Sequence, residues 1–107
     1  MWIASKFGFF SIVQKDGCWH VRARLKDDLV ELVAAAKLTA KLEEWPQADY
    51  RWRVRLKDEA ELTRVFSALQ DSVNYTNFKS HIATLPRQRS KLPAYHELWS
   101  ALYAIQK

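Results

Sequence analysis

Two ten-residue stretches of the chain are similar without a gap: WHVRARLKDD at residues 19–28 and YRWRVRLKDE at residues 50–59. Apolar and polar residues alternate in each stretch up to its leucine, which is the two-residue period of a strand with one buried face. Beyond the leucine, apolar residues recur at helical spacing, so a helix is expected to follow each strand. The repeat therefore predicts two strand-to-helix units related by a pseudo-two-fold axis.

Each unit has a candidate partner strand before it. Residues 8–14 are rich in aromatic and β-branched side chains, and residues 15–17 supply a tight turn. Residues 41–45, followed by the turn 46–49, are the counterpart in the second unit, although they have little strand propensity. The predicted fold is α+β: a four-stranded, mainly antiparallel sheet packed on helices, in a ββα-ββα pseudo-repeat followed by a C-terminal helix.

The two helices of the repeat are expected to begin at capping boxes and to bury one apolar stripe each. Asp28-x-x-Glu31 and Asp58-x-x-Glu61 have the spacing of a capping box. The apolar residues expected to face the sheet are Leu25, Leu29, Leu32, Val33 and Ala36 in the first helix, and Leu62, Val65, Phe66, Leu69 and Val73 in the second.

The last third of the chain is expected to be helical. Helical spacing continues up to Pro86, and the polar segment 74–81 favours a helix boundary over a binding site. Pro93 is tolerated in the first turn of a final helix over residues 94–105. The expected apolar face of that helix is Tyr95, Leu98, Trp99, Leu102 and Ile105.

Length and composition limit the class of protein. The chain has 107 residues, enough for one domain over residues 1–107, and 49% of them are hydrophobic, which excludes a disordered chain. Cys18 alone cannot form an internal disulfide, so a cytoplasmic protein is expected. No apolar run approaches the ~20 residues that a membrane helix needs, so no membrane partner is expected. The net charge of +5 favours an acidic partner.

Alternating arginines are the main candidate binding site. By strand parity they lie on the sheet face opposite the core: Arg22, Arg24, Arg51, Arg53 and Arg55, with His20 beside them. Guanidinium groups bind phosphate bidentately and stack on bases, and Phe9 or Phe10, depending on register, adds a stacking platform. The alternative is that these arginines are solvated, or paired across the strands with Glu43, Glu44 or Asp49.

A second basic region lies between Asp71 and Glu97, where no acidic residue occurs. Its candidate binding residues are Lys79, Arg87, Arg89 and Lys91. Such a segment can meet a phosphate backbone, and the alternative is an ordinary exposed linker. Nucleic acid or an acidic protein is therefore the expected partner of the two basic regions.

No catalytic, metal or cofactor site is expected. Cys18 and His20 share one face of a strand, but the paired ligand spacing of a zinc site is missing. The acidic residues after each repeat strand are explained as first-turn helix residues, and the only glycines, Gly8 and Gly17, form no phosphate loop. The chain is therefore predicted not to be an enzyme.

The five tryptophans fall into two groups. Trp19, Trp52 and Trp99 occupy faces that are expected to be buried, so they are expected in the core. Trp2 and Trp45 have no expected core position, and exposed aromatic residues often mark protein contacts. A homodimer or partner interface is therefore expected near the first strand or the Trp45 corner.

Several motifs are distributed along the chain: Trp2-Ile3, GFFSIV at residues 8–13, RAR at 22–24, YRWR at 50–53 and NYxNFK at 74–79. In these motifs the chain resembles a family of small, uncharacterised bacterial proteins of about this length. The resemblance covers nearly the whole chain, implies a bacterial single-domain protein, and brings no activity, cofactor or site. The function predicted from the residues is a non-enzymatic cytoplasmic binding protein that uses an arginine-rich sheet face for nucleic acid. The alternative is a protein-interaction or self-associating component whose arginines are solvated or paired.

Overall fold

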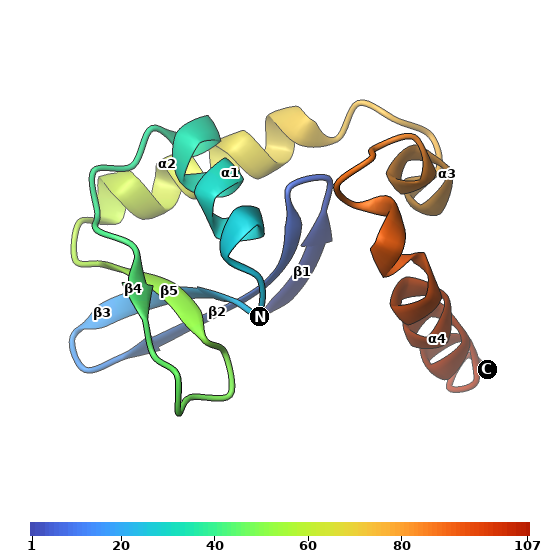
Figure 1. Cartoon of the computed structure of the whole chain (residues 1–107), viewed down its shortest axis with the longest axis horizontal. Coiled ribbons are helices and arrows are strands. Elements are labelled where there is room, and N and C mark those ends of the chain that lie inside the picture. The colour runs from blue at the N-terminus through green and yellow to red at the C-terminus, as the bar shows by residue number, and fades with distance from the viewer. The chain divides into compact units, whose positions relative to one another are not determined.

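The computed structural model describes all 107 residues and divides them into two compact units, residues 1–74 and residues 75–107 (Figure 1). The first unit contains, in chain order, β1 (Trp2–Ser5), β2 (Gly8–Lys15), β3 (Cys18–Ala23), α1 (Lys26–Ala36), β4 (Glu43–Glu44), β5 (Trp52–Leu56) and α2 (Glu59–Ser72). The second contains α3 (Phe78–Ala83), the short 3₁₀ helix η1 (Arg89–Lys91) and α4 (Leu92–Tyr103). One domain over the whole chain stays a prediction.

The first unit is an antiparallel sheet with α1 and α2 on one face (Figure 1). The strand order is β1-β2-β3-β5-β4, and every neighbouring pair is antiparallel. The α+β class is therefore confirmed, with five strands rather than the four expected. The additional strand is β1, whose four residues are too few to show a two-residue period in the sequence.

The pairing of β3 with β5 has the symmetry that the repeat predicts. Arg22 lies opposite Arg53, and these two residues occupy the same position in the two copies. The two flanking pairs are Val21 with Val54 and Ala23 with Trp52. The repeat relates one of these pairs to the other, because Val21 corresponds to Trp52 and Ala23 to Val54. The pseudo-two-fold axis therefore passes between Arg22 and Arg53.

The two hairpins differ in regularity. The first turns at Asp16-Gly17, where the φ angles of 53° and 76° are both positive, as a type I′ turn requires. The second hairpin is present where expected, but β4 has only two paired residues, with Glu43 opposite Arg53. This shortness agrees with the low strand propensity of the segment.

Only one of the two interactions of the expected capping box forms at the start of α2. The Asp58 side chain accepts a hydrogen bond from the Ala60 amide at 2.8 Å. The Glu61 carboxylate does not reach back to the cap, because it accepts a hydrogen bond from the Thr39 amide at 3.1 Å. Glu61 therefore fixes the loop after α1 rather than the first turn of α2.

The helix α1 begins without the capping box expected at Asp28. Its N-cap is Leu25, which has no capping side chain, and Asp28 is buried within the first turn against Gly8. Gly8 has a φ of +144°, and a Cβ atom there would collide with the Asp28 side chain. This close approach of β2 to α1 accounts for the missing cap, and Leu25 is exposed rather than part of the stripe.

The core lies between the helices and one face of the sheet. Its buried cluster is Phe10, Ile12, Val21, Ala23, Leu29, Leu32, Ala36, Val54, Leu56, Val65 and Leu69. Partly buried side chains packed on this cluster include Trp19, Val33, Trp52, Leu62 and Phe66. Val73, expected at the end of the second stripe, is exposed because it is the C-cap residue that follows α2.

The helix boundary predicted within residues 74–81 is confirmed. The helix α2 ends at Ser72, and a new helix begins at Asn77, whose side chain accepts a hydrogen bond from the Ser80 amide at 2.9 Å. Asparagine suits this position because its side-chain oxygen replaces a missing backbone acceptor.

The apolar face predicted for the final helix is only partly buried. Tyr95 is buried and contacts the Phe78 ring of α3, with the ring centroids 5.1 Å apart. Trp99 and all residues after it are exposed, because α4 extends past the side chains that cover Tyr95. The expectation that Trp99 belongs to a core is therefore wrong for this unit.

Candidate anion-binding face of the sheet

The strand register brings one residue from each strand into a row across the sheet. In strand order the row is Trp2, Ser11, Arg22, Arg53 and Glu43. Neighbouring Val21 and Val54 are buried in the core, so this row lies on the opposite sheet face, which we call the outer face. Phe9, His20 and Arg55 share the outer face by the same parity. The predicted parity is thereby confirmed for Arg22, Arg53 and Arg55, whereas Arg24 and Arg51 lie just outside β3 and β5.

Arg53 is on the predicted face but is buried there, with 2% of its surface exposed. The Trp45 ring covers it, with the guanidinium carbon 3.9 Å from the ring centroid. Its Nη2 donates to the Tyr50 carbonyl at 3.1 Å, and its Nη1 bonds to His20 Nδ1 at 3.1 Å. The expectation of an open arginine face is wrong at this position, because the segment between β4 and β5 carries Trp45 over the sheet.

His20 is held in one neutral form by this contact. A guanidinium can only donate, so Nδ1 accepts from Arg53 and the imidazole carries its proton on Nε2. Burial lowers the pKa of His20 below its usual 6.5, and the positive charge of Arg53 lowers it further. The Trp45 ring stands edge-on to the imidazole at 5.9 Å. His20 is therefore a neutral hydrogen-bond acceptor beneath the outer face at pH 7.

Arg22 and Arg53 form no ion pair. Neither takes part in any of the four ion pairs within 4.0 Å. Arg22 Nη2 donates to the Ser11 hydroxyl at 2.6 Å, while the Nε groups of both arginines are buried without a hydrogen-bond partner. Burial lowers the pKa of Arg53 and the charge of Arg22 lowers it further, whereas the charge of Glu43 on the neighbouring strand acts in the opposite direction. Two facing guanidinium groups thus lie at the symmetry axis outside any ion pair, and the charge of Glu43 offsets only part of theirs.

The other three arginines are paired with acidic residues. The pairs are Arg24 with Asp49 at 3.5 Å, Arg51 with Glu44 at 2.6 Å and Arg55 with Glu43 at 2.8 Å. These three carboxylates are the cross-strand partners in the alternative prediction from the sequence. The hydrogen bond from Arg55 is the main cause that lowers the pKa of Glu43, and Trp45 Nε1 also donates to this carboxylate at 3.1 Å.

An exposed aromatic pair adjoins the unpaired arginines. Trp2 is 69% exposed and meets the Phe9 ring edge-on, with the centroids 6.1 Å apart. The sequence left Phe9 and Phe10 as alternative platforms, and the register decides for Phe9, because Phe10 is buried in the core. Trp2 and Arg22 are both paired with Ser11, so the aromatic pair and the guanidinium lie on one surface.

Sequence reasoning missed Tyr50 as a member of the outer face. Alternation places Tyr50 on the core face, but β5 starts only at Trp52, so parity does not extend to it. Its buried ring lies 4.7 Å from the guanidinium carbon of Arg22 and 4.3 Å from that of Arg24. The only signal in the sequence is that Trp45 and Tyr50 flank one turn, which allows both rings to fold onto the same face.

Four of the nine predicted binding residues belong to the second unit: Lys79, Arg87, Arg89 and Lys91. Lys79 Nζ donates to His96 Nδ1 at 3.4 Å and lies 4.8 Å from the Trp99 ring centroid. Lys91 Nζ donates to the Gln88 side chain at 2.7 Å. The predicted residues therefore form two sets, one in each unit.

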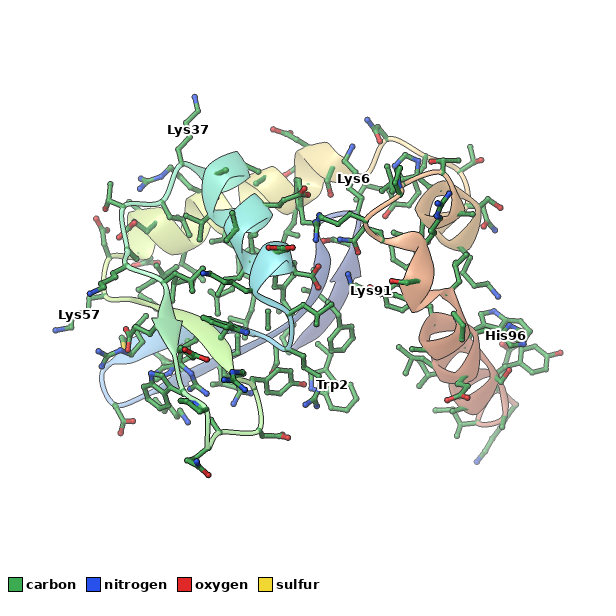
Figure 2. The ribbon with its side chains drawn as sticks, in the orientation of Figure 1. Trp2, Lys6, Lys37, Lys57, Lys91 and His96 are labelled. Carbon is green, nitrogen blue, oxygen red and sulfur yellow. The ribbon has the colours of Figure 1, made fainter.

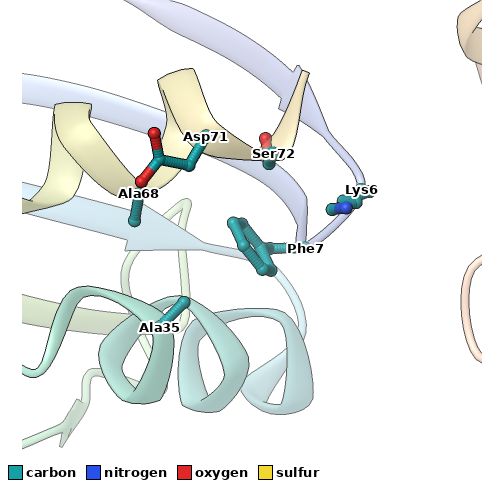
Figure 3. Close-up of a pocket in the computed structure, with 6 residues that line it drawn as sticks. All are labelled: Lys6, Phe7, Ala35, Ala68, Asp71 and Ser72. Carbon is teal, nitrogen blue, oxygen red and sulfur yellow. The ribbon is translucent and has the colours of Figure 1, made fainter. Parts of the chain in front are cut away.

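A shallow cavity of about 330 Å³ lies elsewhere in the first unit, where the Phe7 ring projects between α1 and α2 (Figure 3). Its lining is Lys6, Phe7, Ala35, Ala68, Asp71 and Ser72. The Ser72 hydroxyl donates to the Leu69 carbonyl at 2.6 Å, and Lys6 Nζ donates to Asn74 at 3.3 Å. The lining contains no histidine or cysteine, and no three potential metal ligands group together anywhere in the chain.

Comparisons with protein-family models, with curated proteins and with solved structures found no match to this chain. The resemblance to small bacterial proteins therefore stays a prediction. None of the helices has the length and apolar character that crossing a membrane requires.

Proposed function

We propose that this protein is a non-enzymatic binding protein whose outer face binds single-stranded nucleic acid. The observation that carries the proposal is that Arg22 forms no ion pair, faces the buried charge of Arg53 and lies on one surface with the exposed Trp2. A phosphate at Arg22 adds negative charge beside the two guanidinium groups, and an unpaired base has a face that stacks on an aromatic ring. The single cysteine supports a cytoplasmic location.

The proposed contact is narrower than the five-arginine surface expected from the sequence. Arg51 and Arg55 are held by short ion pairs to Glu44 and Glu43, so their charge is compensated within the chain. Arg24 is half exposed, and its ion pair with Asp49 is longer, at 3.5 Å. Exposed pairs of this kind contribute only about 0–1 kcal/mol, so a phosphate can displace the carboxylate. Arg22, Arg24 and the aromatic pair are therefore the proposed surface.

The experiment is a fluorescence-anisotropy titration with a labelled strand of about 12 nucleotides, as single strand and as duplex, at about 50 and 200 mM salt. The single strand is expected to bind more tightly, because only unpaired bases can stack on Trp2. Its affinity should fall with salt, because phosphate contacts release counterions. Equal affinity for both forms would remove the stacking part of the proposal, and no binding at the lower salt concentration would refute the proposal.

Two variants locate the binding surface. Arg22→Gln is expected to weaken binding and to flatten its salt dependence, whereas Trp2→Ala is expected to weaken binding at both salt concentrations equally. Lys57→Gln is the matched control, because Lys57 is exposed and extends into solvent (Figure 2). If the control weakens binding as much as Arg22→Gln, the attraction comes from net charge and not from the outer face.

An acidic protein partner is the second candidate. The uncompensated guanidinium pair favours it as well, because a glutamate or aspartate carboxylate supplies the same bidentate acceptor as phosphate. Polyglutamate as competitor in the titration separates the two partners. Displacement of the labelled strand at equal charge concentration would favour the acidic protein, and self-association through Trp2 would appear as a concentration-dependent mass.

A further inference from the structure

The second unit carries most of the net charge of the chain. Its basic residues are Lys79, Arg87, Arg89, Lys91 and Lys107, and its only acidic residue is Glu97. Residues 75–107 therefore contribute a formal charge of +4 to the total of +5. So strong a concentration in one unit favours an anionic partner for that unit.

The same unit exposes a group of large apolar side chains at the end of α4, which we call the apolar tip. The group and its exposed fractions are Trp99, 50%; Leu102, 56%; Tyr103, 59%; and Ile105, 72%. Trp99, Leu102 and Tyr103 are spaced three and four residues apart, so they share one side of the helix. Contiguous apolar surface of this kind marks a contact with another apolar body.

The rings around the apolar tip are stacked on one another. The Trp99 ring is nearly parallel to the His96 ring, at 5.9 Å and 15°, and to the Tyr103 ring, at 5.1 Å and 16°. Lys79 lies over the same indole at 4.8 Å, and His96 marks this side of α4 in Figure 2. The indole is therefore held by neighbours of its own unit while half of its surface stays exposed to a partner.

Three kinds of partner can be compared for the apolar tip. A second copy of the chain would bring two units of charge +4 together, which is unfavourable. Nucleic acid satisfies the charge, but its polar backbone and bases do not take up the exposed aliphatic side chains of Leu102 and Ile105. An anionic lipid surface satisfies both features, because it takes up aliphatic side chains, accommodates Trp and Tyr at the headgroup level, and attracts basic residues.

We propose that the second unit docks on anionic lipid surfaces by inserting the apolar tip of α4 while its basic residues contact the headgroups. Apolar insertion and electrostatic attraction are the two signals that stable peripheral binding needs. The sequence-based expectation of no membrane partner rested on the absence of a membrane-spanning segment. Peripheral docking does not require such a segment. The proposal does not depend on the outer face of the sheet.

The test is co-sedimentation of the full chain with sucrose-loaded vesicles. Vesicles of phosphatidylcholine alone are compared with vesicles that contain about 30% phosphatidylglycerol. Binding is expected to the anionic vesicles only. Because the chain has five tryptophans, the quenching of Trp99 by acrylamide is taken as the difference between the chain and Trp99→Phe; Trp99 is expected to be accessible before binding and shielded on binding. Shielding of Trp99 already in the absence of lipid would mean that the apolar tip is covered in the free protein, and would overturn the proposal.

Variants separate the two signals. Leu102→Ser with Ile105→Ser is expected to lower vesicle binding at least about tenfold, because two exposed aliphatic anchors are lost. Lys79→Gln is expected to lower it about fivefold, the usual effect of one basic residue near a charged membrane. The matched controls are Val30→Ser, an exposed aliphatic residue of α1, and Lys57→Gln; both are expected to bind as the original chain does.

Other results would overturn the proposal and point elsewhere. Equal binding to neutral and anionic vesicles would remove the role of charge. A dimer in sedimentation equilibrium that Leu102→Ser with Ile105→Ser abolishes, without vesicle binding, would assign the apolar tip to a second copy. If Arg22→Gln abolishes vesicle binding, the lipid contact belongs to the outer face and not to the apolar tip. If the same variant loses only oligonucleotide binding, the result concerns the proposed function and leaves the lipid proposal intact.

Discussion

Replacing Arg53 tests whether its buried charge is uncompensated. The change Arg53→Met removes two hydrogen bonds from a charged donor, to His20 and to the Tyr50 carbonyl, each worth about 1.5–3 kcal/mol. It also removes the contact with the Trp45 ring, worth up to about 2 kcal/mol. Taken alone, these losses predict a destabilisation of about 3–8 kcal/mol.

The opposing term is the cost of keeping the charge buried. A buried guanidinium outside any ion pair pays a desolvation penalty of several kcal/mol, and the facing Arg22 adds repulsion that the charge of Glu43 only partly offsets. Methionine fills a similar volume beneath Trp45 and carries no charge, so the two terms nearly cancel. We expect Arg53→Met to lie within about 2 kcal/mol of the original chain, whereas Arg53→Ala, which leaves a void, should cost about 3–5 kcal/mol.

The assay is urea unfolding monitored by tryptophan fluorescence, with circular dichroism to verify the fold and with equal m-values as the condition for comparing free energies of unfolding. Arg24→Gln is the matched control, since this exposed arginine should change stability by only about 0–1 kcal/mol. Equal losses for Arg53→Met and Arg53→Ala, both above about 3 kcal/mol, would refute the reasoning, because the charge itself would then be stabilising.

Three further predictions concern the first unit. The pKa of His20 is lowered by burial and by Arg53, so the unfolded chain takes up a proton more readily than the folded chain. The free energy of unfolding should therefore fall as the pH decreases below about 6.5. In urea titrations at several pH values, His20→Gln should flatten this dependence. Gly8→Ala should cost about 2–5 kcal/mol in the same assay, because alanine is strained at a φ of +144° and its Cβ collides with Asp28; a loss below 1 kcal/mol would contradict this close packing. Asp58→Ala should cost about 1 kcal/mol through loss of the α2 cap, and Asp58→Asn should recover most of it.

The sequence alone was sufficient for the features that depend on neighbouring residues. The repeat at residues 19–28 and 50–59 predicted two strands, the helix after each and their pseudo-two-fold relation, because alternation and helical spacing are local patterns. Asp16-Gly17 predicted the first turn for the same reason, since positive φ is a property of the residues themselves. Strand parity also assigned Arg22, Arg53 and Arg55 to the correct face. The acidic residues near the second strand were likewise recognisable as partners for the other arginines, as three ion pairs show.

The tertiary structure decided which of those arginines remain uncompensated. Alternation assigns a side chain to a face but does not say what covers that face, so the burial of Arg53 beneath Trp45 depends on how the segment between β4 and β5 folds back. The capping box expected at Asp28 failed for a similar reason, because Gly8 on a separate strand approaches it. Helical periodicity likewise identified the apolar face of α4, but whether Trp99 is buried depends on which elements reach it, and the neighbouring α3 covers only the beginning of that face. Charge compensation and burial are sums over groups distant in the chain, and for this protein only the folded arrangement determines them.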